Sequence, residues 1–385
     1  MDAAIGPSIR ERSVRRAHIS CDVPDPVACL RSRLGQGPFA LVALFVSPRS
    51  DFERVVHDAK AAFGAAEVIA CTTAGEIADG GYTEGTIVAV GFPSTDFAAK
   101  VVVVPDLSDF AHHSLVDQIT TTRAELAREF PMFGEEFGFL MVDGLSRMED
   151  QLTATLAMGL GATPIFGGSA GDGANFRKTL VSASGRTLRN AAVVALVRTC
   201  CRVKVFKTDH LRPTDTRMVV TEADPERRLV REINAEPAAR EYARILGLDP
   251  EQLTTFTFAA HPVVVRMGGQ HYVRAIQKVT DTGELIFFCA IDEGLVLTLA
   301  DAKPMVEHLA GALDALAVHG RPAVILAADC ILRRKEAEEK QLTGAISALL
   351  SSHSVVGFST YGEQVNGLHV NQTLTGVAIY PPAAP

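Results

Sequence analysis

The chain repeats one pattern three times, and this repeat constrains its fold more than any other feature of the sequence. Each copy reads as an apolar strand, a loop that carries arginine, a helical segment, and a second apolar strand that ends in glycine followed by a carboxylate. The copies span residues 39–76, 138–172 and 323–363. Two of them close with similar residues, CTTAGE and FSTYGE. Strands that are buried on both faces and joined by a helix are typical of right-handed βαβ units in a parallel sheet.

The segments around these copies predict a mixed α/β fold with antiparallel as well as parallel pairing. Residues 175–235 contain short β-rich runs separated by turn residues, which favours an antiparallel sheet, and residues 254–300 return to strands. A chain of 385 residues suits two domains of ordinary size. We expect an N-terminal extension at 1–35, a first domain at 36–235 and a second at 236–385. No low-complexity linker separates the two domains, so we expect them to pack closely.

Composition argues against several classes of partner. The formal net charge of −8 disfavours a nucleic-acid backbone, which requires a basic surface. No apolar run reaches the roughly 18 residues that membrane insertion needs, and the first 20 residues lack the apolar core of a secretory signal. The seven cysteines have no metal-type or redox-type spacing. The sequence therefore predicts a cytoplasmic protein with reduced, mostly structural thiols and with no nucleic-acid or membrane partner.

The repeat also predicts where a ligand would bind. In a βαβ unit the loops that leave both strands lie on the same edge of the sheet, and open α/β sheets bind ligands along that edge. An arginine beside a carboxylate there can hold a zwitterion such as an amino acid. The alternative is that each arginine pairs with its own carboxylate and only caps the helix, since duplication of a scaffold also produces a repeat. The pairs concerned are Arg49 with Glu76, Arg147 with Asp172, and Arg333 or Arg334 with Glu363.

Catalytic and metal motifs are sparse. The sequence has no Walker-type phosphate loop, no nucleophile elbow and no pair of histidines at metal-ligand spacing. The glycine-rich segment 167–173 either holds an anion with backbone N–H groups or forms a tight turn with positive φ. Cys330 is either a packed residue at a strand end or a nucleophile whose pKa is lowered by two neighbouring arginines. His369 and His261 are each either a structural imidazole or a candidate haem ligand.

Several of these segments together resemble the FIST family of sensory-domain proteins. VIACTTAGEI and GGSAGDG are similar to its N-terminal half, and AHPVVV, ADCILRR, VVGFSTYGEQ and HVNQTLTG to its C-terminal half, in the family's order from about residue 36 to about 380. The resemblance implies a ligand-sensing module of bacterial signal transduction that is attached to, or encoded beside, an output protein. Amino acids are proposed ligands of the family. One branch binds haem, senses nitric oxide and acts on a histidine kinase, and the closing motifs resemble that branch most.

On this basis we expect a stand-alone sensor, not an enzyme, that binds a small molecule and signals through a separate partner such as a histidine kinase. The candidate haem ligands are His369 and, secondarily, His261. One alternative is a small-molecule enzyme that uses Cys330 or the edge carboxylates, and another is a structural partner protein without a ligand. The predicted ligand-binding positions, from the repeat and the resemblance together, are Arg49, Thr73, Gly75, Glu76, Arg147, Gly168, Asp172, Cys330, Arg333, Tyr361, Glu363 and Asn371.

Overall fold

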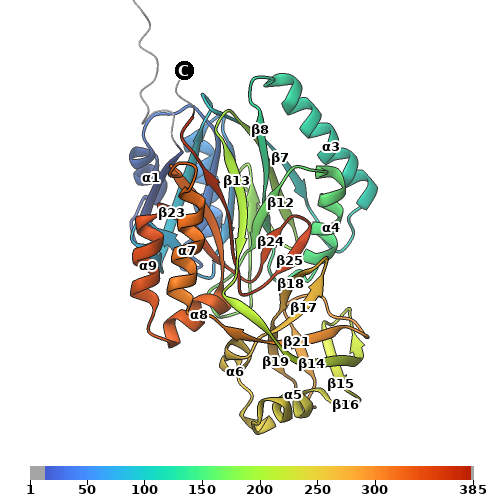
Figure 1. Cartoon of the computed structure of the whole chain (residues 1–385). Coiled ribbons are helices and arrows are strands. Elements are labelled where there is room, and N and C mark those ends of the chain that lie inside the picture. The colour runs from blue at the N-terminus through green and yellow to red at the C-terminus, as the bar shows by residue number, and fades with distance from the viewer. Residues whose placement is uncertain (1–13, 383–385) are drawn as a thin grey trace, which may run out of the picture.

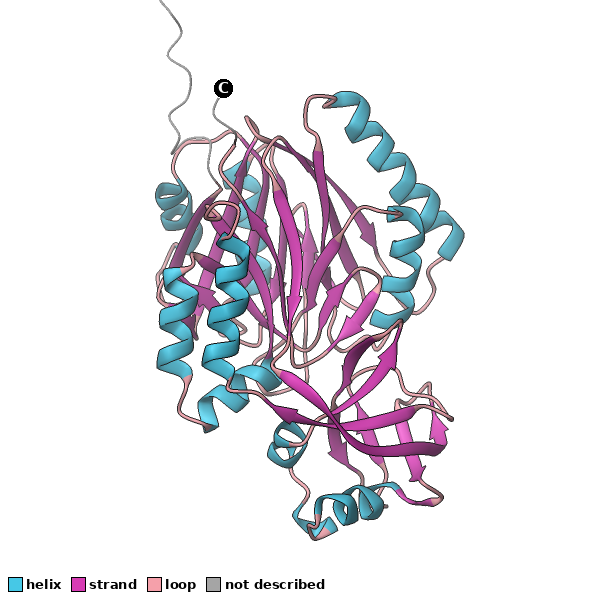
Figure 2. Cartoon of the chain, viewed as in Figure 1, coloured by secondary structure: helices cyan, strands magenta, loops and turns pink. Residues whose placement is uncertain are grey.

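The computed structural model describes residues 14–382, so residues 1–13 of the predicted N-terminal extension lie outside the described part. The described residues form a body of three sheets and a smaller domain that projects from one end of it (Figure 1). Helices cover the outer faces of the body, while its strands gather inside (Figure 2). The inner faces of the three sheets share one apolar core. The predicted mixed α/β fold is confirmed.

The first repeat forms the first sheet. β2 (Phe39–Val46) and β3 (Glu67–Thr72) run parallel and are joined by α2 (Phe52–Phe63), as the sequence predicts. β2 reads as a continuous apolar run because both of its faces are buried: Phe45 packs in the shared core, and Leu44 packs in the cluster under the helices. The other elements of this sheet and its helical layer are β1 (Arg15–Ser20), α1 (Pro26–Leu34) and β6 (Thr86–Pro93).

The second repeat follows the same plan. Its elements and neighbours are β7 (Phe97–Val104), α3 (His112–Glu129), β8 (Glu135–Val142), α4 (Glu149–Leu160), β9 (Ile165–Ser169) and β12 (Ala192–Thr199). β8 and β9 run parallel, and β12 lies antiparallel beside β8, as β6 lies beside β2. α3 and α4 cover the outer face of this sheet (Figure 1).

The third repeat differs in its connection, which holds two short helices in place of one. Its elements and neighbours are β13 (Val203–Thr208), α7 (Met305–Ala317), β22 (Val324–Cys330), α8 (Ile331–Glu339), α9 (Thr343–Ser352), β23 (Val355–Thr360) and β26 (Leu374–Ile379). β22 and β23 run parallel, and β26 lies antiparallel beside β22. α7 and α9 pack on the outer face, which leaves α8 at the end where the chain leaves β22.

A short hairpin follows each repeat and pairs with the sheet of another repeat. The hairpin strands are β4 (Glu76–Ala78) and β5 (Gly81–Thr83), β10 (Val181–Ala183) and β11 (Arg186–Leu188), and β24 (Glu363–Val365) and β25 (Leu368–Val370). β4 pairs with β23 of the third sheet, β24 with β9 of the second, and β10 with β3 of the first. The three repeats thus exchange hairpins in a closed cycle, which ties their sheets into one body.

The small domain is an antiparallel sheet with helices packed on it. Its elements are β14 (Leu211–Asp224), β15 (Leu229–Ile233), β16 (Glu236–Pro237), α5 (Ala238–Leu246), the 3₁₀ helix η1 (Pro250–Gln252), α6 (Thr255–Ala260), β17 (Val263–Met267), β18 (Gln270–Arg274), β19 (Ile276–Val279), β20 (Leu285–Phe287) and β21 (Val296–Ala302). Ile233 and Ala238 share its core, so the predicted division at 235 and 236 falls inside this domain. Within the described part of the chain, no helix has the length and apolar character needed to span a membrane.

Candidate functional site

The chain passes from one sheet to the next at three corners, which are Gly75-Glu76, Gly171-Asp172 and Gly362-Glu363. Glu76 accepts hydrogen bonds from the hydroxyl of Thr73 and from both the N–H and the hydroxyl of Thr86. Glu363 accepts the same three bonds from threonines at the same spacing, three residues before it and ten residues after it. The first and third corners therefore share one bonding pattern.

The corner glutamates have a structural role in addition to their position at the strand ends. Both side chains are fully buried, and both oxygens of each carboxyl group are engaged. Burial raises the pKa of Glu363 to about 8, although the bonds from Thr360 and Thr373 act in the opposite direction. Burial also raises the pKa of Glu76, against the bonds from its own threonines. Each glutamate fastens the end of a strand to the segment that follows the exchanged hairpin.

The second corner is built around Asp172. Its carboxylate accepts hydrogen bonds from the backbone N–H groups of Phe176, Arg177 and Lys178 at 2.7–2.9 Å, and from the hydroxyl of Tyr361. The ring of Phe176 stacks on that of Tyr361, with 4.2 Å between centroids. Asp172 thus holds the loop after the second repeat against a tyrosine of the third.

Segments from all three repeats meet around a cavity of about 340 Å³, which we call the corner cavity. Arg49 comes from the loop after β2, and Arg334 and Lys335 come from α8. Two carboxylates on the rim, Glu84 and Glu338, have exposed side-chain fractions of 71% and 34%. The wall therefore presents groups of both charges to a ligand.

Arg334 forms part of this wall. Its guanidinium lies 3.3 Å from both Glu84 and Glu338 and donates to the carbonyl of Thr83. It also passes so close to the first corner that a Cβ on Gly75 would lie 2.0 Å from one of its nitrogens. Gly75 has in addition a φ of +127°, which residues with side chains rarely adopt. The corner requires glycine for both reasons.

We expect Gly75→Ala to lower the free energy of unfolding by about 2 kcal/mol or more, because backbone strain and the displacement of Arg334 act together. Gly311→Ala in α7 is the control. A Cβ there would meet no atom within 4 Å, and alanine is the better helix former by about 1 kcal/mol. Urea unfolding followed by circular dichroism compares the two variants. Wild-type stability of Gly75→Ala would show that the corner tolerates a side chain.

The structure places the predicted ligand-binding positions in three groups. Arg49, Gly75, Glu76 and Asp172 line the corner cavity. Two others line a cavity of about 390 Å³ between the body and the small domain, which we call the interdomain cavity; they are Arg147 and Tyr361. The remaining positions are enclosed in the interior, and they are Thr73, Gly168, Cys330, Arg333, Glu363 and Asn371. A larger cavity, about 850 Å³, lies between α1 and α2 and contains none of the predicted positions.

Arg49 and Arg333 do not pair with the carboxylates at the ends of their own repeats, as the structural alternative expected. Arg49 lies 3.5 Å from Asp22, and this ion pair is exposed. Arg333 is fully buried, with its Nε 3.0 Å from Asp329 and its Nη1 3.4 Å from Nδ1 of His210. Adjacent side chains on a helix point about 100° apart, so the neighbour of Arg333 faces the corner cavity instead. Of the two arginines that the sequence left open, Arg334 is the one at the cavity.

The interpretation of Cys330 as a nucleophile is not supported. The expectation that two arginines lower its pKa is wrong, because burial raises the pKa of the thiol well above its ordinary value and the charge of Glu363 raises it further. The thiolate is the reactive form of cysteine. The side chain is fully buried and belongs to an apolar cluster, as the structural alternative predicts.

The two histidines lie in different surroundings. His261 is exposed at the end of α6. His369 is buried on β25, where burial lowers the pKa of its ring and keeps it neutral. Its Nδ1 lies 3.2 Å from the amide nitrogen of Gln364, and a Cβ on Gly362 would lie 2.9 Å from Nε2. Nε2, the nitrogen that would bind iron, is buried and has no hydrogen-bond partner within residues 14–382, so the assignment of His369 as a haem ligand stays a prediction.

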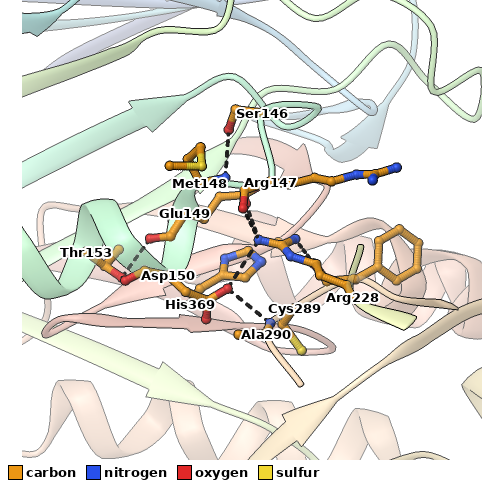
Figure 3. Close-up of polar contacts among 12 residues, drawn as sticks. Ser146, Arg147, Met148, Glu149, Asp150, Thr153, Arg228, Cys289, Ala290 and His369 are labelled. Atoms are coloured by element: carbon orange, nitrogen blue, oxygen red, sulfur yellow. Dashed lines mark hydrogen bonds and ion pairs between the residues drawn. The ribbon is translucent and has the colours of Figure 1, made fainter. Parts of the chain in front are cut away.

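A buried arginine that no sequence motif marked joins the small domain to the body. Arg228, from the loop between β14 and β15, reaches the first turn of α4 (Figure 3). Its guanidinium lies 2.7 Å from the carboxylate of Glu149 and 3.2 Å from that of Asp150. It also donates to the backbone carbonyls of Arg147 and Phe288. We call this set of contacts the Arg228 clamp.

The volume of the corner cavity, about 340 Å³, lies within the range of small-molecule sites. The fold is mixed α/β, and the corner cavity is its candidate ligand site. Comparison with known families agrees with the resemblance noted in the motifs. The FIST N domain matches residues 40–236, and the FIST C domain matches residues 238–366.

The chain therefore belongs to the FIST family. FIST domains are associated with sensory signal transduction and with the binding of small ligands. The boundary between the two matched regions lies between β16 and α5, inside the small domain. A search of curated proteins found no match.

Proposed function

We propose that this protein is a sensor that binds a small zwitterion, such as a free amino acid, in the corner cavity and signals through a separate partner such as a histidine kinase. The observation that carries the proposal is the meeting of all three repeats around one cavity of about 340 Å³ with cations and carboxylates in its wall. This volume lies at the lower end of the range for ligand pockets, which suits a molecule of amino-acid size.

Arg49 is the group that is best placed to receive the ligand carboxylate. Its side chain is 64% exposed, and its pair with Asp22 is a surface ion pair worth little in water. The guanidinium can therefore leave Asp22 and bind a ligand carboxylate with little loss of free energy. Glu84 and Glu338 supply the opposite charge for a ligand ammonium group.

Side-chain contacts at the second corner connect the corner cavity to the small domain. Asp172 lines the corner cavity and accepts a hydrogen bond from Tyr361, whose ring lines the interdomain cavity. Phe176 stacks on that ring and also lies near Phe288 of the small domain, at 5.9 Å between centroids. A ligand that contacts Asp172 differently in two states shifts the balance between two orientations of the small domain.

Calorimetric titration with the free amino acids tests the proposal. We expect one or a few amino acids to bind, and their amidated and deaminated analogues to bind at least about tenfold more weakly because each lacks one charge. Arg49→Ala should weaken binding about tenfold. Arg54→Ala is a matched control, since Arg54 is 62% exposed and lies 3.5 Å from Asp58 but is outside the corner cavity.

Two results would contradict the proposal. One is the absence of binding by every amino acid to folded protein. The other is equal affinity of wild-type protein and Arg49→Ala, which would place the ligand elsewhere.

A further inference from the structure

We propose that the interdomain cavity is a second ligand site and that it takes a planar anionic molecule, such as an aromatic carboxylate. Its volume is about 390 Å³. The body contributes Arg147 and Tyr361 to the wall, and the small domain contributes Lys278 and Phe288. The interdomain cavity shares no lining residue with the corner cavity, so this proposal does not require a ligand in the corner cavity.

Two cations in this wall have no partner among residues 14–382. Within residues 14–382, the guanidinium of Arg147 and the ammonium of Lys278 make no ion pair or hydrogen bond, and both side chains are exposed. Figure 3 shows Arg147 extending away from the Arg228 clamp. Glu149 also lines the cavity, but it and Asp150 are paired with Arg228. The charged residues that line the cavity are thus the cations Arg147, Arg228 and Lys278 and the carboxylate Glu149, which leaves a net positive charge even when Asp150 is counted.

Aromatic side chains form the other part of the wall. Phe176 is stacked on Tyr361 with an angle of 20° between the rings, and Phe288 is tilted by 38° against Phe176. Phe176 and Phe288 are both partly exposed. A ligand with an aromatic ring and a carboxylate would bury its ring against these faces. Its carboxylate would form an ion pair with Arg147 or Lys278. A cationic ligand or a neutral polar ligand would form no ion pair with Arg147 or Lys278.

Fluorescence titration with indole-3-acetate tests the assignment. The chain contains no tryptophan, so emission excited at 295 nm comes from the indole probe. We expect saturable binding of indole-3-acetate, and binding about tenfold weaker for the neutral indole-3-acetamide and weaker still for the cationic tryptamine. Arg147→Ala and Lys278→Ala should each weaken the binding of indole-3-acetate by about fivefold or more, since each removes a charged partner.

The controls separate this site from the corner cavity. Arg49→Ala should leave the affinity for indole-3-acetate unchanged, and Arg231→Ala should do the same because Arg231 is a surface cation of the small domain that already has carboxylate partners. Circular dichroism confirms that each variant is folded. Equal affinity for indole-3-acetate and indole-3-acetamide would overturn the proposal. Loss of binding in Arg49→Ala, or no binding of indole-3-acetate at all, would also overturn it.

Discussion

Glu363→Gln is expected to remove a steep pH dependence of stability. In the folded protein the pKa of Glu363 is about 8 because the carboxyl group is buried, whereas in the unfolded chain it is near the ordinary value of 4.5. The folded state therefore holds a proton that the unfolded state releases. Since the folded pKa is the higher one, the stabilising contribution is complete below about pH 4.5 and is lost as pH rises through about 8. At about 1.4 kcal/mol per tenfold change in proton affinity, the full loss is about 5 kcal/mol.

Urea unfolding at several pH values measures this effect. A glutamine amide can accept from Thr373 and donate to Thr360, so it replaces the protonated carboxyl group without a charge. We expect the variant and the wild type to be of similar stability at pH 5, and the variant to be the more stable of the two at pH 9. The control is Glu84→Gln, whose side chain is 71% exposed. A constant difference between wild type and Glu363→Gln from pH 5 to pH 9 would show that Glu363 is ionised throughout.

The same corners show how far the sequence predicts the fold. The parallel pairs β2–β3, β8–β9 and β22–β23 follow from local patterns, because each is an apolar run, a helical segment and another apolar run in succession. The exchange of hairpins does not follow from local patterns. β4 pairs with β23, whose partner residues lie 280 and 282 positions further along the chain, and nothing within a short hairpin specifies which of three similar sheets it will join.

The candidate site could be predicted only in part, because local sequence patterns do not specify which distant segments come together. The position of the corners followed from the repeat, and four of the predicted positions line the corner cavity. The bonding of the corner glutamates was also within reach, since Thr73 and Thr86 have the same spacing to Glu76 as Thr360 and Thr373 have to Glu363. A repeated threonine at both distances indicates a structural bond.

The orientation of the arginine side chains was beyond the sequence. α8 carries a dense run of charged residues, so it has too little apolar pattern to show which of Arg333 and Arg334 faces the core. Lys335 and Glu338 of the corner cavity were missed for the same reason. Arg228 was missed because it lies in a loop whose partners are contributed by a distant helix.

Loss of the Arg228 clamp is expected to cause the second large effect. In Arg228→Met, the carboxylates of Glu149 and Asp150 lose the cation that compensates them, and Glu149 is nearly fully buried. Breaking a buried ion pair by removal of one partner costs about 3–5 kcal/mol. Because Arg228 also bonds to backbone carbonyls on both sides of the domain boundary, we expect the loss to be greatest where the small domain contacts the body. Hydrogen exchange at the first turn of α4, together with urea unfolding, measures it.

Two further variants identify the cause of this effect. Arg231→Ala removes a surface arginine of the same domain, whose ion pairs lie at 3.3–3.6 Å and whose side chain is 38% exposed, and it should cost about 1 kcal/mol or less. The triple variant Arg228→Met with Glu149→Gln and Asp150→Asn removes all three charges together and should regain much of the lost stability, because no uncompensated charge remains in the interface. If the triple variant is no more stable than Arg228→Met, the stabilisation by Arg228 comes mainly from the hydrogen bonds of its guanidinium to Arg147 and Phe288. The ion pairs with Glu149 and Asp150 then contribute little to stability. If Arg228→Met is as stable as Arg231→Ala, the small domain is held in place by its apolar contacts alone.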